Sequence, residues 1–430
     1  MNNLRRVKLG SFFTQSVAGE WGSEPTGIDD VTVYRAADFS KDCKLNVTEG
    51  ALRSVPKNKL SNRKLNRNDI LVEKSGGSPT QPVGRAVIYK PESDEQVATC
   101  SNFLQRLVVD EEYSPEFVYY LMLGLYQANA TLPYQQQTTG IYNLKLEEYL
   151  QTEVDTYVDR NLQEKVADIL STIDHQIDAT QALIDKYTAI KQGMMADLFS
   201  RGIDPETKAL RPTFEKAAEL YHETPLGMLP KGWVCAPIKK FVQSAEYGIS
   251  TSLNDDSSGI PVLRMNNIQN NRFNVEDLKF TKDPEAYRLK LSAGDVLYNR
   301  TNSMEHVGKT AIWRGELSEC SFASYLVRIN VDERELLPEY FSFWMSQESS
   351  QNALRAFATP AVQQVNINPT NLQRVLMSCP VSLLEQQEIV DRIDAVDAVL
   401  LREREALLKL NAQKSGLMQD LLTGKVPVPA

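Results

Sequence analysis

The chain has 430 residues, of which 42% are hydrophobic, and it carries a formal net charge of −9. This length exceeds one typical domain and allows sizeable cores, so two or three domains are expected. No unbroken apolar run is long enough to cross a bilayer, and no apolar segment follows the basic N-terminal residues, so we expect a cytoplasmic protein without a membrane span. Five scattered cysteines and three histidines show no metal-ligand spacing, which argues against disulfides and a zinc site.

Residues 1–160 are predicted to form an α/β domain with short strands. The apolar runs that predict strands are residues 67–72, 84–89 and 105–109. Pro115 opens a buried helix that is expected to run to Leu125. Residues 74–81 (KSGGSPTQ) and residues 134–144 (YQQQTTGIYNL) are rich in polar and turn-forming residues, so both are predicted as loops.

A long helix is predicted over residues 161–200, because apolar residues recur there at the alternating spacing of a coiled-coil seam. Residues 201–232 follow as a linker that contains four prolines. Residues 233–384 are predicted to form a second α/β domain, and residues 385–423 a second long helix.

The second long helix repeats the first at a constant offset. Its seam consists of Ile389, Ile393, Val396, Leu400, Leu407, Leu410, Leu417 and Leu421. Subtracting 223 from each number gives an apolar residue in every case: Val166, Leu170, Ile173, Ile177, Ile184, Tyr187, Met194 and Leu198. Two seam positions are polar in both copies, Thr180 with Glu403 and Lys191 with Lys414. An offset without gaps indicates internal duplication.

The domains repeat in the same order. Residues 294–300 correspond to residues 68–74, and residues 362–368 correspond to residues 139–145, at offsets between 222 and 226. The chain is therefore expected to consist of domain, helix, domain and helix, which gives an α/β (α+β) fold with an internal two-fold repeat.

Acidic and basic residues are distributed unequally. Residues 162–200 contain three basic and six acidic residues, and residues 385–421 contain five and eight. By contrast, residues 35–90 contain twelve basic and five acidic residues, and residues 264–314 contain nine and six. The acidic helices suit a protein-binding or spacing role, whereas the basic stretches suit either an ordinary solvated surface or a nucleic-acid contact.

Several segments resemble the specificity subunits of type I restriction-modification systems. They are residues 383–389 (LLEQQEI) at the start of the second long helix, residues 417–424 (LMQDLLTG) at its end, and residues 227–233 (GMLPKGW) before the second domain. The duplicated plan also matches. The first helix departs from the pattern, because Leu162, Gln163 and Glu164 stand where the family has Glu-Gln.

This resemblance implies two tandem target recognition domains, separated and spaced by two long helices packed as an antiparallel coiled coil. It also implies that the chain binds a bipartite, asymmetric site in double-stranded DNA. The partners expected from the family are two modification (methyltransferase) subunits and the restriction (translocase and nuclease) subunits. S-adenosylmethionine, ATP and Mg²⁺ would then belong to those partners, with no cofactor in this chain.

The residues themselves indicate no catalysis. Asn368 and Pro369 begin the turn that adenine methyltransferases use, but Thr370 replaces its second proline, and residues 204–208 lie in a proline-rich linker without a strand to arrange metal ligands. A coiled-coil scaffold that presents two protein-binding or sugar-binding domains is the alternative function, and a nuclease is the third.

The candidate DNA-binding residues are polar groups in the predicted loops. Arg can bind guanine in a bidentate manner and Asn or Gln can bind adenine, which selects as base contacts Gln81, Arg85, Gln135, Gln136, Gln137, Arg264, Asn266, Asn267, Arg300, Asn302 and Gln363. Phosphate contacts are expected from Ser75, Ser78, Thr80, Thr301, Ser303 and Lys309. The set is completed by Lys74, Gly76, Thr138 and Gln364. Each is alternatively an ordinary solvated loop residue.

Overall fold

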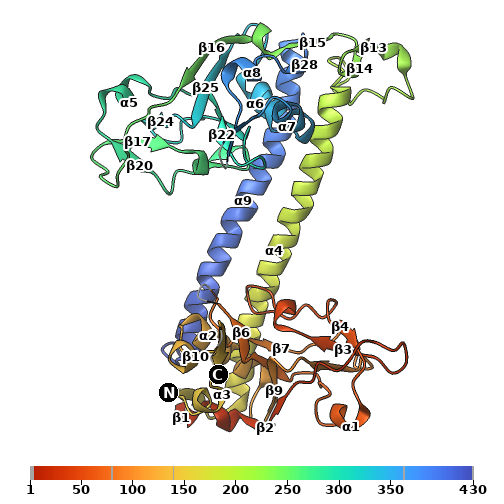
Figure 1. Ribbon diagram of the computed structural model, residues 1–430, viewed down its shortest axis with the longest axis vertical. Helices are drawn as coiled ribbons and strands as arrows, with labels where there is room; N and C mark the ends of the chain where they lie inside the picture. Colours follow the sequence, from red (N-terminus) through yellow and green to blue (C-terminus); the bar gives the residue numbers. More distant parts are fainter. Residues whose placement is uncertain (1–3, 79–80, 139, 362–363, 429–430) are drawn as a thin grey trace. The chain divides into compact units, whose positions relative to one another are not determined.

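The computed structural model describes residues 4–78, 81–138, 140–361 and 364–428 and is shown in Figure 1. The chain divides into two compact units. Unit 1 comprises Met1–Ala182 and Arg404–Ala430, and unit 2 comprises Leu183–Glu403. Each unit takes one α/β domain and one half of each long helix, so the units do not coincide with the five segments predicted from the sequence.

The first domain mixes short strands and short helices. Its strands are β1 (Leu4–Lys8), β2 (Phe13–Ala18), β3 (Val31–Tyr34), β4 (Ala51–Arg53), β5 (Ile70–Glu73), β6 (Ser75–Gly77), β7 (Ala86–Ile88), β8 (Ala98–Cys100), β9 (Leu104–Val109), β10 (Gln135–Thr138), β11 (Ile141–Leu144) and β12 (Glu153–Tyr157). Its helices are η1 (Leu9–Phe12), η2 (Ala36–Asp38), α1 (Lys57–Leu60), α2 (Pro115–Gln127), η3 (Leu132–Tyr134) and α3 (Leu146–Tyr149). The long helix α4 (Arg160–Arg201) follows.

The second half of the chain contains a similar set of short strands and helices and ends with the second long helix. Its strands are β13 (Tyr221–Thr224), β14 (Gly227–Pro230), β15 (Trp233–Pro237), β16 (Val242–Tyr247), β17 (Ile260–Leu263), β18 (Ile268–Gln269), β19 (Arg272–Phe273), β20 (Lys279–Thr281), β21 (Val296–Asn299), β22 (Thr301–Asn302), β23 (Thr310–Ile312), β24 (Ser321–Phe322), β25 (Leu326–Val331), β26 (Thr359–Ala361), β27 (Gln364–Asn366) and β28 (Leu376–Pro380). Its helices are η4 (Ala218–Leu220), η5 (Ile238–Lys240), η6 (Met265–Asn267), α5 (Pro284–Arg288), α6 (Pro338–Ser346), α7 (Glu348–Arg355), α8 (Pro369–Leu372) and α9 (Leu383–Leu422).

The sheets of the two domains have matching strand orders. A four-stranded antiparallel sheet runs β2-β9-β5-β7 in unit 1 and β16-β25-β21-β23 in unit 2. A three-stranded sheet with one parallel pair runs β4-β3-β8 in unit 1 and β20-β17-β24 in unit 2. The central strands β5 and β21 are buried at every position, which fits their short apolar runs. Among the described residues, no helix has the length and apolarity that a membrane crossing requires.

Both long helices contribute to the core of each unit. In unit 1, Val166 and Leu170 of α4 share one apolar cluster with Met418 and Leu421 of α9 and with the residues of α2. The equivalent cluster of unit 2 combines the end of α4 with the start of α9 and with α6. The apolar seam predicted from the sequence is therefore the surface on which each domain and its two half-helices pack.

A buried glutamine attaches each domain to the long helix that follows it. Gln163 is 1% exposed; its Oε1 accepts from the Ser114 backbone N–H at 2.9 Å, and its Nε2 donates to the Tyr157 carbonyl at 2.9 Å. Gln386, 223 positions later, is fully buried and accepts from the Leu337 N–H at 2.8 Å. It donates to the carbonyls of Glu335 and Pro380 at 2.9 and 2.8 Å.

The neighbouring position differs between the repeats. Glu385, which is 3% exposed, accepts from Arg211 Nη1 and Nη2 at 2.5 and 3.0 Å. It also accepts from the Ile203 N–H and from Trp233 Nε1, both at 3.0 Å. The equivalent residue in unit 1 is the half-buried Leu162. Within unit 2, Glu385 thus bonds the linker to the start of α9, a contact that the apolar Leu162 cannot make.

Candidate nucleic-acid interface

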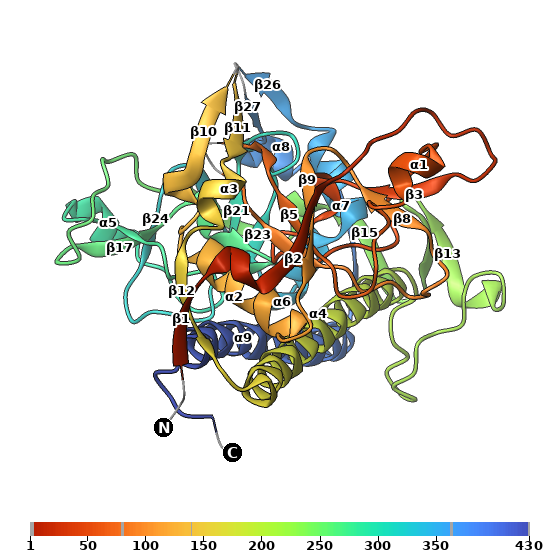
Figure 2. The same ribbon diagram turned by 90° about the horizontal axis from the view of Figure 1, so that it is seen from below.

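The two polar segments of the first domain that were predicted as loops form one small sheet. Strands β10 and β11 pair as an antiparallel hairpin, and β11 also pairs with β6. The hairpin lies on the side of the domain away from α4 (Figure 2). The loop prediction was wrong for these segments, because strand pairing, which sequence periodicity does not reveal, organises residues of low strand propensity.

A row of polar residues crosses this sheet. Gln136 lies opposite Asn143, and Asn143 lies opposite Ser75, so the three side chains share one face. The Ser75 hydroxyl donates to Asn143 Oδ1 at 2.5 Å. Gln137 lies opposite Tyr142 on the other face. The row therefore presents amide and hydroxyl groups in fixed positions.

The second domain contains the equivalent sheet, with the order β22-β27-β26. Its row consists of Thr301, Asn366 and Thr359, in which Asn366 Nδ2 donates to Thr301 Oγ1 at 2.8 Å. Asn143 and Asn366 are 223 positions apart, as are Gln136 and Thr359. The two rows thus share their central asparagine but differ at the outer strand.

A glycine bulge distinguishes the two sheets. The register between β11 and β6 shifts between Tyr142 and Asn143, so that the strand pairing passes over Gly76. Gly76 has φ +114°, a conformation that other residues rarely adopt. In the second domain Asn302 pairs directly with Val365 and the register is regular. The two sheets consequently offer differently shaped polar surfaces.

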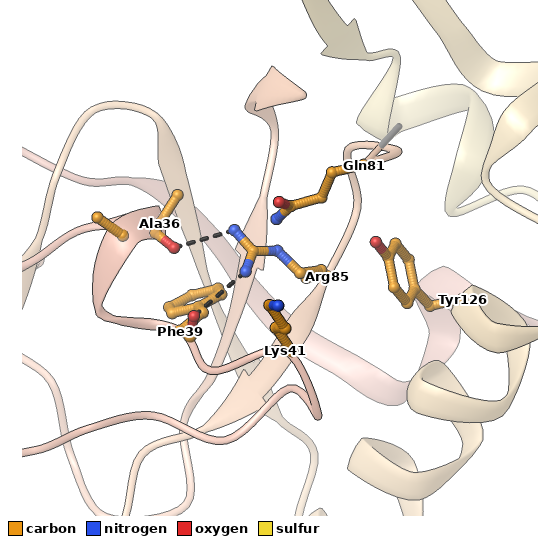
Figure 3. A pocket seen from close by; sticks show the side chains of 7 residues that line it. Ala36, Phe39, Lys41, Gln81, Arg85 and Tyr126 are labelled. Atoms are coloured by element: carbon orange, nitrogen blue, oxygen red, sulfur yellow. Dashed lines mark hydrogen bonds between the residues drawn. The ribbon is translucent and has the colours of Figure 1, made fainter. Parts of the chain in front are cut away.

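Arg85 is a structural residue. Its side chain is buried and forms a bidentate pair with Glu73, with Nε–Oε2 and Nη2–Oε1 distances of 2.9 and 3.1 Å. It also donates to the carbonyls of Ala36 and Phe39 at 2.9 and 3.3 Å (Figure 3). Because these partners occupy its guanidinium, the prediction of Arg85 as a base contact is withdrawn.

A cavity of about 540 Å³ lies beside Arg85. Figure 3 shows Lys41, Gln81 and Tyr126 around it, with the ring of Phe39 below the guanidinium. Lys41 and Gln81 are exposed, whereas the Tyr126 hydroxyl donates to the Pro82 carbonyl at 3.0 Å. The exposed pair places a cation and an amide near β6, and Lys41 is a candidate that the sequence did not single out.

In the second domain, two predicted contacts also have structural partners. Asn267 is 2% exposed and accepts from the Arg264 N–H at 2.8 Å, while its Nδ2 donates to the carbonyls of Asn274 and Asp277, both at 2.9 Å. Arg264 pairs with the Asp277 carboxylate at 2.9 Å. Asn267 is therefore a turn residue that holds the segment after β17, and its prediction as a base contact is withdrawn. The neighbouring Asn266 is exposed.

Arg300 and Asn302 are half-buried beside the row of β22. The Arg300 guanidinium lies 4.9 Å from the Tyr247 ring centroid, and its Nε donates to the Ser324 carbonyl at 2.9 Å. Asn302 Oδ1 accepts from the Ser303 N–H at 2.8 Å. These contacts hold both side chains without burying them, so a nucleic acid could still reach them.

The remaining predicted residues have various positions. Lys74 Nζ donates to Gln105 Oε1 at 3.3 Å, and Gln135 Nε2 donates to the Val83 carbonyl at 3.3 Å. Ser78 and Gln81 form an isolated bridge. The exposed residues include Ser303, Lys309 and Gln364. Thr80, Gln363 and the side chain of Thr138 lie outside the described part of the structure.

Asn143, Asn366 and Thr359 were absent from the predicted set. The match between residues 139–145 and 362–368 pairs the two asparagines, so this signal was present in the sequence. Only the strand pairing shows that these residues belong to the polar rows. Among the described residues, no group of three or more His, Cys, Asp or Glu side chains could hold a metal ion.

Comparisons with known proteins show which proteins this chain resembles. Residues 230–410 match the family model described as "Type I restriction modification DNA specificity domain". The chain is 26% identical over 208 residues to the putative type I restriction enzyme MjaX specificity subunit of Methanocaldococcus jannaschii, covering 48% of this chain and 49% of that protein. It is 21% identical over 272 residues to the type I restriction enzyme EcoKI specificity subunit of Escherichia coli K12, covering 61% of this chain and 56% of that protein.

The matched segments span about half the length of these relatives. The crystal structure of a type I restriction-modification S subunit from M. genitalium is similar over a greater length, with a TM-score of 0.58 and 12% identity, and the match covers 100% of this chain and 97% of that one. That similarity shows the fold. The family model, the named relatives and the shared fold agree, and the chain is similar to the specificity subunits of type I restriction-modification systems.

Proposed function

We propose that this chain recognises a bipartite, asymmetric sequence in double-stranded DNA and directs the enzymes that modify and cleave it. The observation that carries the proposal is the duplicated three-stranded sheet, because it places a polar row at the same position of both domains. The rows differ at Gln136 and Thr359, so the two half-sites are expected to differ.

A two-stranded ribbon fits the major groove of B-DNA, where each base pair has its own pattern of donors and acceptors. In the first domain, Gln136 and Asn143 are the proposed base contacts, with Gln137 and Gln81 nearby. In the second domain, Asn302, Asn366 and Thr359 take this role. Exposed cations such as Lys41 and Lys309 would contact phosphates, which position the protein without selecting a sequence.

The long helices are proposed to separate the domains as an antiparallel coiled coil. Helix α4 has 42 residues and α9 has 40, so each spans about 60 Å at about 1.5 Å per residue. That length suits two contacts separated by one or more turns of duplex. Two modification subunits would dock on the helices, and restriction subunits would join them, supplying S-adenosylmethionine, ATP and Mg²⁺ chemistry in the cytoplasm. This chain itself would perform no catalysis.

Salt dependence tests this proposal against the scaffold alternative. With the chain purified together with its modification partner, we expect DNA affinity to fall steeply between low and moderate salt, because phosphate contacts release counterions. Sequencing of methylated adenines in cells that express the pair should return one bipartite target. Absence of salt-dependent binding to any duplex, together with an unmethylated genome, would favour the scaffold.

Lengthening the helices tests their spacing role. Seven residues inserted in register after Ala179 and seven after Arg402 add about 10 Å while preserving the seam. The same half-sites should then be methylated with a spacer about three base pairs longer, at about 3.4 Å each. An unchanged spacer would show that the helices do not set the distance.

A further inference from the structure

Two lysines occupy seam positions of the long helices and are largely buried. In unit 1, Lys414 Nζ lies 2.6 Å from Asp174 Oδ1, and the side chains are 11% and 10% exposed. In unit 2, Lys191 Nζ lies 2.6 Å from Asp397 Oδ1, with exposures of 16% and 9%. Buried charges of this kind are costly unless they are paired.

The two pairs are equivalent members of the repeat. Lys191 and Lys414 are 223 positions apart, and so are Asp174 and Asp397. Each pair takes its lysine from one long helix and its aspartate from the other. A parallel alignment of equivalent positions would instead place lysine beside lysine and aspartate beside aspartate, so only antiparallel helices satisfy both pairs.

An aromatic residue from the adjacent domain covers each pair. In unit 1, Lys414 Nζ lies 6.0 Å from the centroid of the Tyr120 ring on α2, and the Tyr120 hydroxyl donates to Asp174 Oδ2 at 2.8 Å. In unit 2, Lys191 Nζ lies 5.5 Å from the ring of Phe343 on α6. Tyr120 and Phe343 are again 223 positions apart. We call these sets the Lys414 cluster and the Lys191 cluster.

In two antiparallel helices of one chain, the numbers of residues that face each other add to a constant total. The two ion pairs have the same total, so a single antiparallel register forms both of them. An apolar seam repeats every seven residues and tolerates a slide of one heptad, whereas an isolated ion pair does not. A slide in either direction would remove each charge from its partner. The residues then facing Asp174, Lys191, Asp397 and Lys414 would be Leu421, Arg404, Leu198 and Gln181 in one direction, or Leu407, Val390, Ile184 and Ala167 in the other.

We propose that the Lys414 and Lys191 clusters fix the register of the long helices and thereby the spacing between the two DNA half-sites. Each cluster includes a residue of the domain's own helix, so helix register and domain position depend on the same contact. This inference rests on the proposed function. The apolar seam alone would permit several spacings of the half-sites, and the four charged residues of the two ion pairs select one of them.

The test replaces the four charged side chains of the two clusters with apolar side chains that can remain buried. The variant Lys191→Met, Asp397→Leu, Lys414→Met, Asp174→Leu keeps an apolar seam, and such replacements often preserve or raise stability. With the modification partner bound, affinities are measured for duplexes carrying the native spacer and spacers three base pairs shorter or longer. We expect the preference of the variant for the native spacer to fall by about tenfold or more relative to the wild type.

Charge-reversed variants provide the rescue. Lys191→Asp combined with Lys414→Asp should lose the native spacer preference, and adding Asp397→Lys and Asp174→Lys should restore it, because both pairs reform with opposite polarity. Lys208 and Glu388 supply the control. Their ion pair is 2.6 Å long and lies nearer the surface of unit 2, with Lys208 exposed and Glu388 half-buried, so Lys208→Met with Glu388→Leu should leave the preference unchanged.

Retention of the full spacer preference by the folded apolar variant would overturn the inference, and the contacts of the domains with the helix ends would then set the register alone. Failure of restoration in a folded four-fold reversal would also count against it. Failure of the proposed function looks different, because the wild-type assembly would then show no salt-dependent, sequence-selective binding at any spacer.

Discussion

Units 1 and 2 have the same framework and different polar surfaces. The strand orders, the buried glutamines Gln163 and Gln386, and the lysine-aspartate pairs match between them. The outer strands β10 and β26 do not match, and neither does the register beside β6 and β22. Duplication has thus preserved the residues that attach each domain to the helices, whereas those exposed on the small sheet have diverged. Substitutions can therefore change the contacts between a domain and the long helices without changing the polar face of its small sheet, and the reverse.

The largest expected effect concerns Glu385, since only unit 2 has a buried carboxylate at this position. Glu385→Ala would leave the buried Arg211 guanidinium without its carboxylate partner, so we expect about 3 to 5 kcal/mol of destabilisation of unit 2. Denaturant unfolding followed by hydrogen exchange would locate the loss. The matched control is Leu162→Ala in unit 1, where only apolar contact is removed. Equal losses in the two variants would contradict the different roles of these positions.

The next effect separates the two reading surfaces. Changing Gln135, Gln136 and Gln137 to Ala should weaken recognition of one half-site only, by about 1 to 3 kcal/mol for each glutamine that binds a base in a bidentate manner. Thr359→Ala should affect only the other half-site. Competition binding against duplexes mutated in one half-site at a time measures both. Equal weakening for every sequence would assign the glutamines to phosphate contacts or to none.

Single substitutions sharpen the same experiment. Gln136 and Gln137 lie on opposite faces of the hairpin, and only Gln136 belongs to the row with Asn143 and Ser75. We expect Gln136→Ala to account for most of the reduced discrimination of the triple variant. A dominant effect of Gln137→Ala would place the other face of the ribbon against the bases.

A smaller difference concerns the two ion-pair clusters. Tyr120→Phe removes the hydroxyl that bonds Asp174 and makes the Lys414 cluster resemble the Lys191 cluster, so we expect a loss of about 1 kcal/mol in unit 1. Phe343→Tyr is the reciprocal variant in unit 2. Thermal unfolding of both variants would show whether the hydroxyl alone distinguishes the clusters, and an unchanged stability of Tyr120→Phe would show that the hydroxyl makes no net contribution.

The effect expected to be smallest near neutral pH is shared by both units. Burial raises the pKa of Cys100 in unit 1 and of Cys379 in unit 2 to about 12. An unfolded thiol has a pKa of about 8.5, so the folded state retains the proton at higher pH and stability should decline progressively as the pH rises from about 8.5 toward 12. Cys100→Ala and Cys379→Ala should each reduce that pH slope in their own unit. An unaltered slope would contradict the buried, protonated state.

The framework could be predicted because it depends on patterns local to the sequence. The seam of α4 and α9 follows a heptad spacing, and Pro115 marks the start of α2. The small sheets could not be predicted, since the glutamines of β10 have no apolar alternation and become a strand only through pairing with β11. Arg85 illustrates the same difficulty, because its interaction with Glu73 forms across two strands and cannot be distinguished in sequence from an exposed arginine.

The buried glutamines have a consequence for exchanging domains. Within the described structure, the side chains of Gln163 and Gln386 bond to main-chain atoms of the domains they hold. A different domain could therefore be grafted onto the same helix end without any complementary side chain, provided that its backbone supplies one N–H and one carbonyl at matching places. This contact does not depend on the side chains of the domain. Recombination could therefore replace a recognition domain while the long helices stay unchanged.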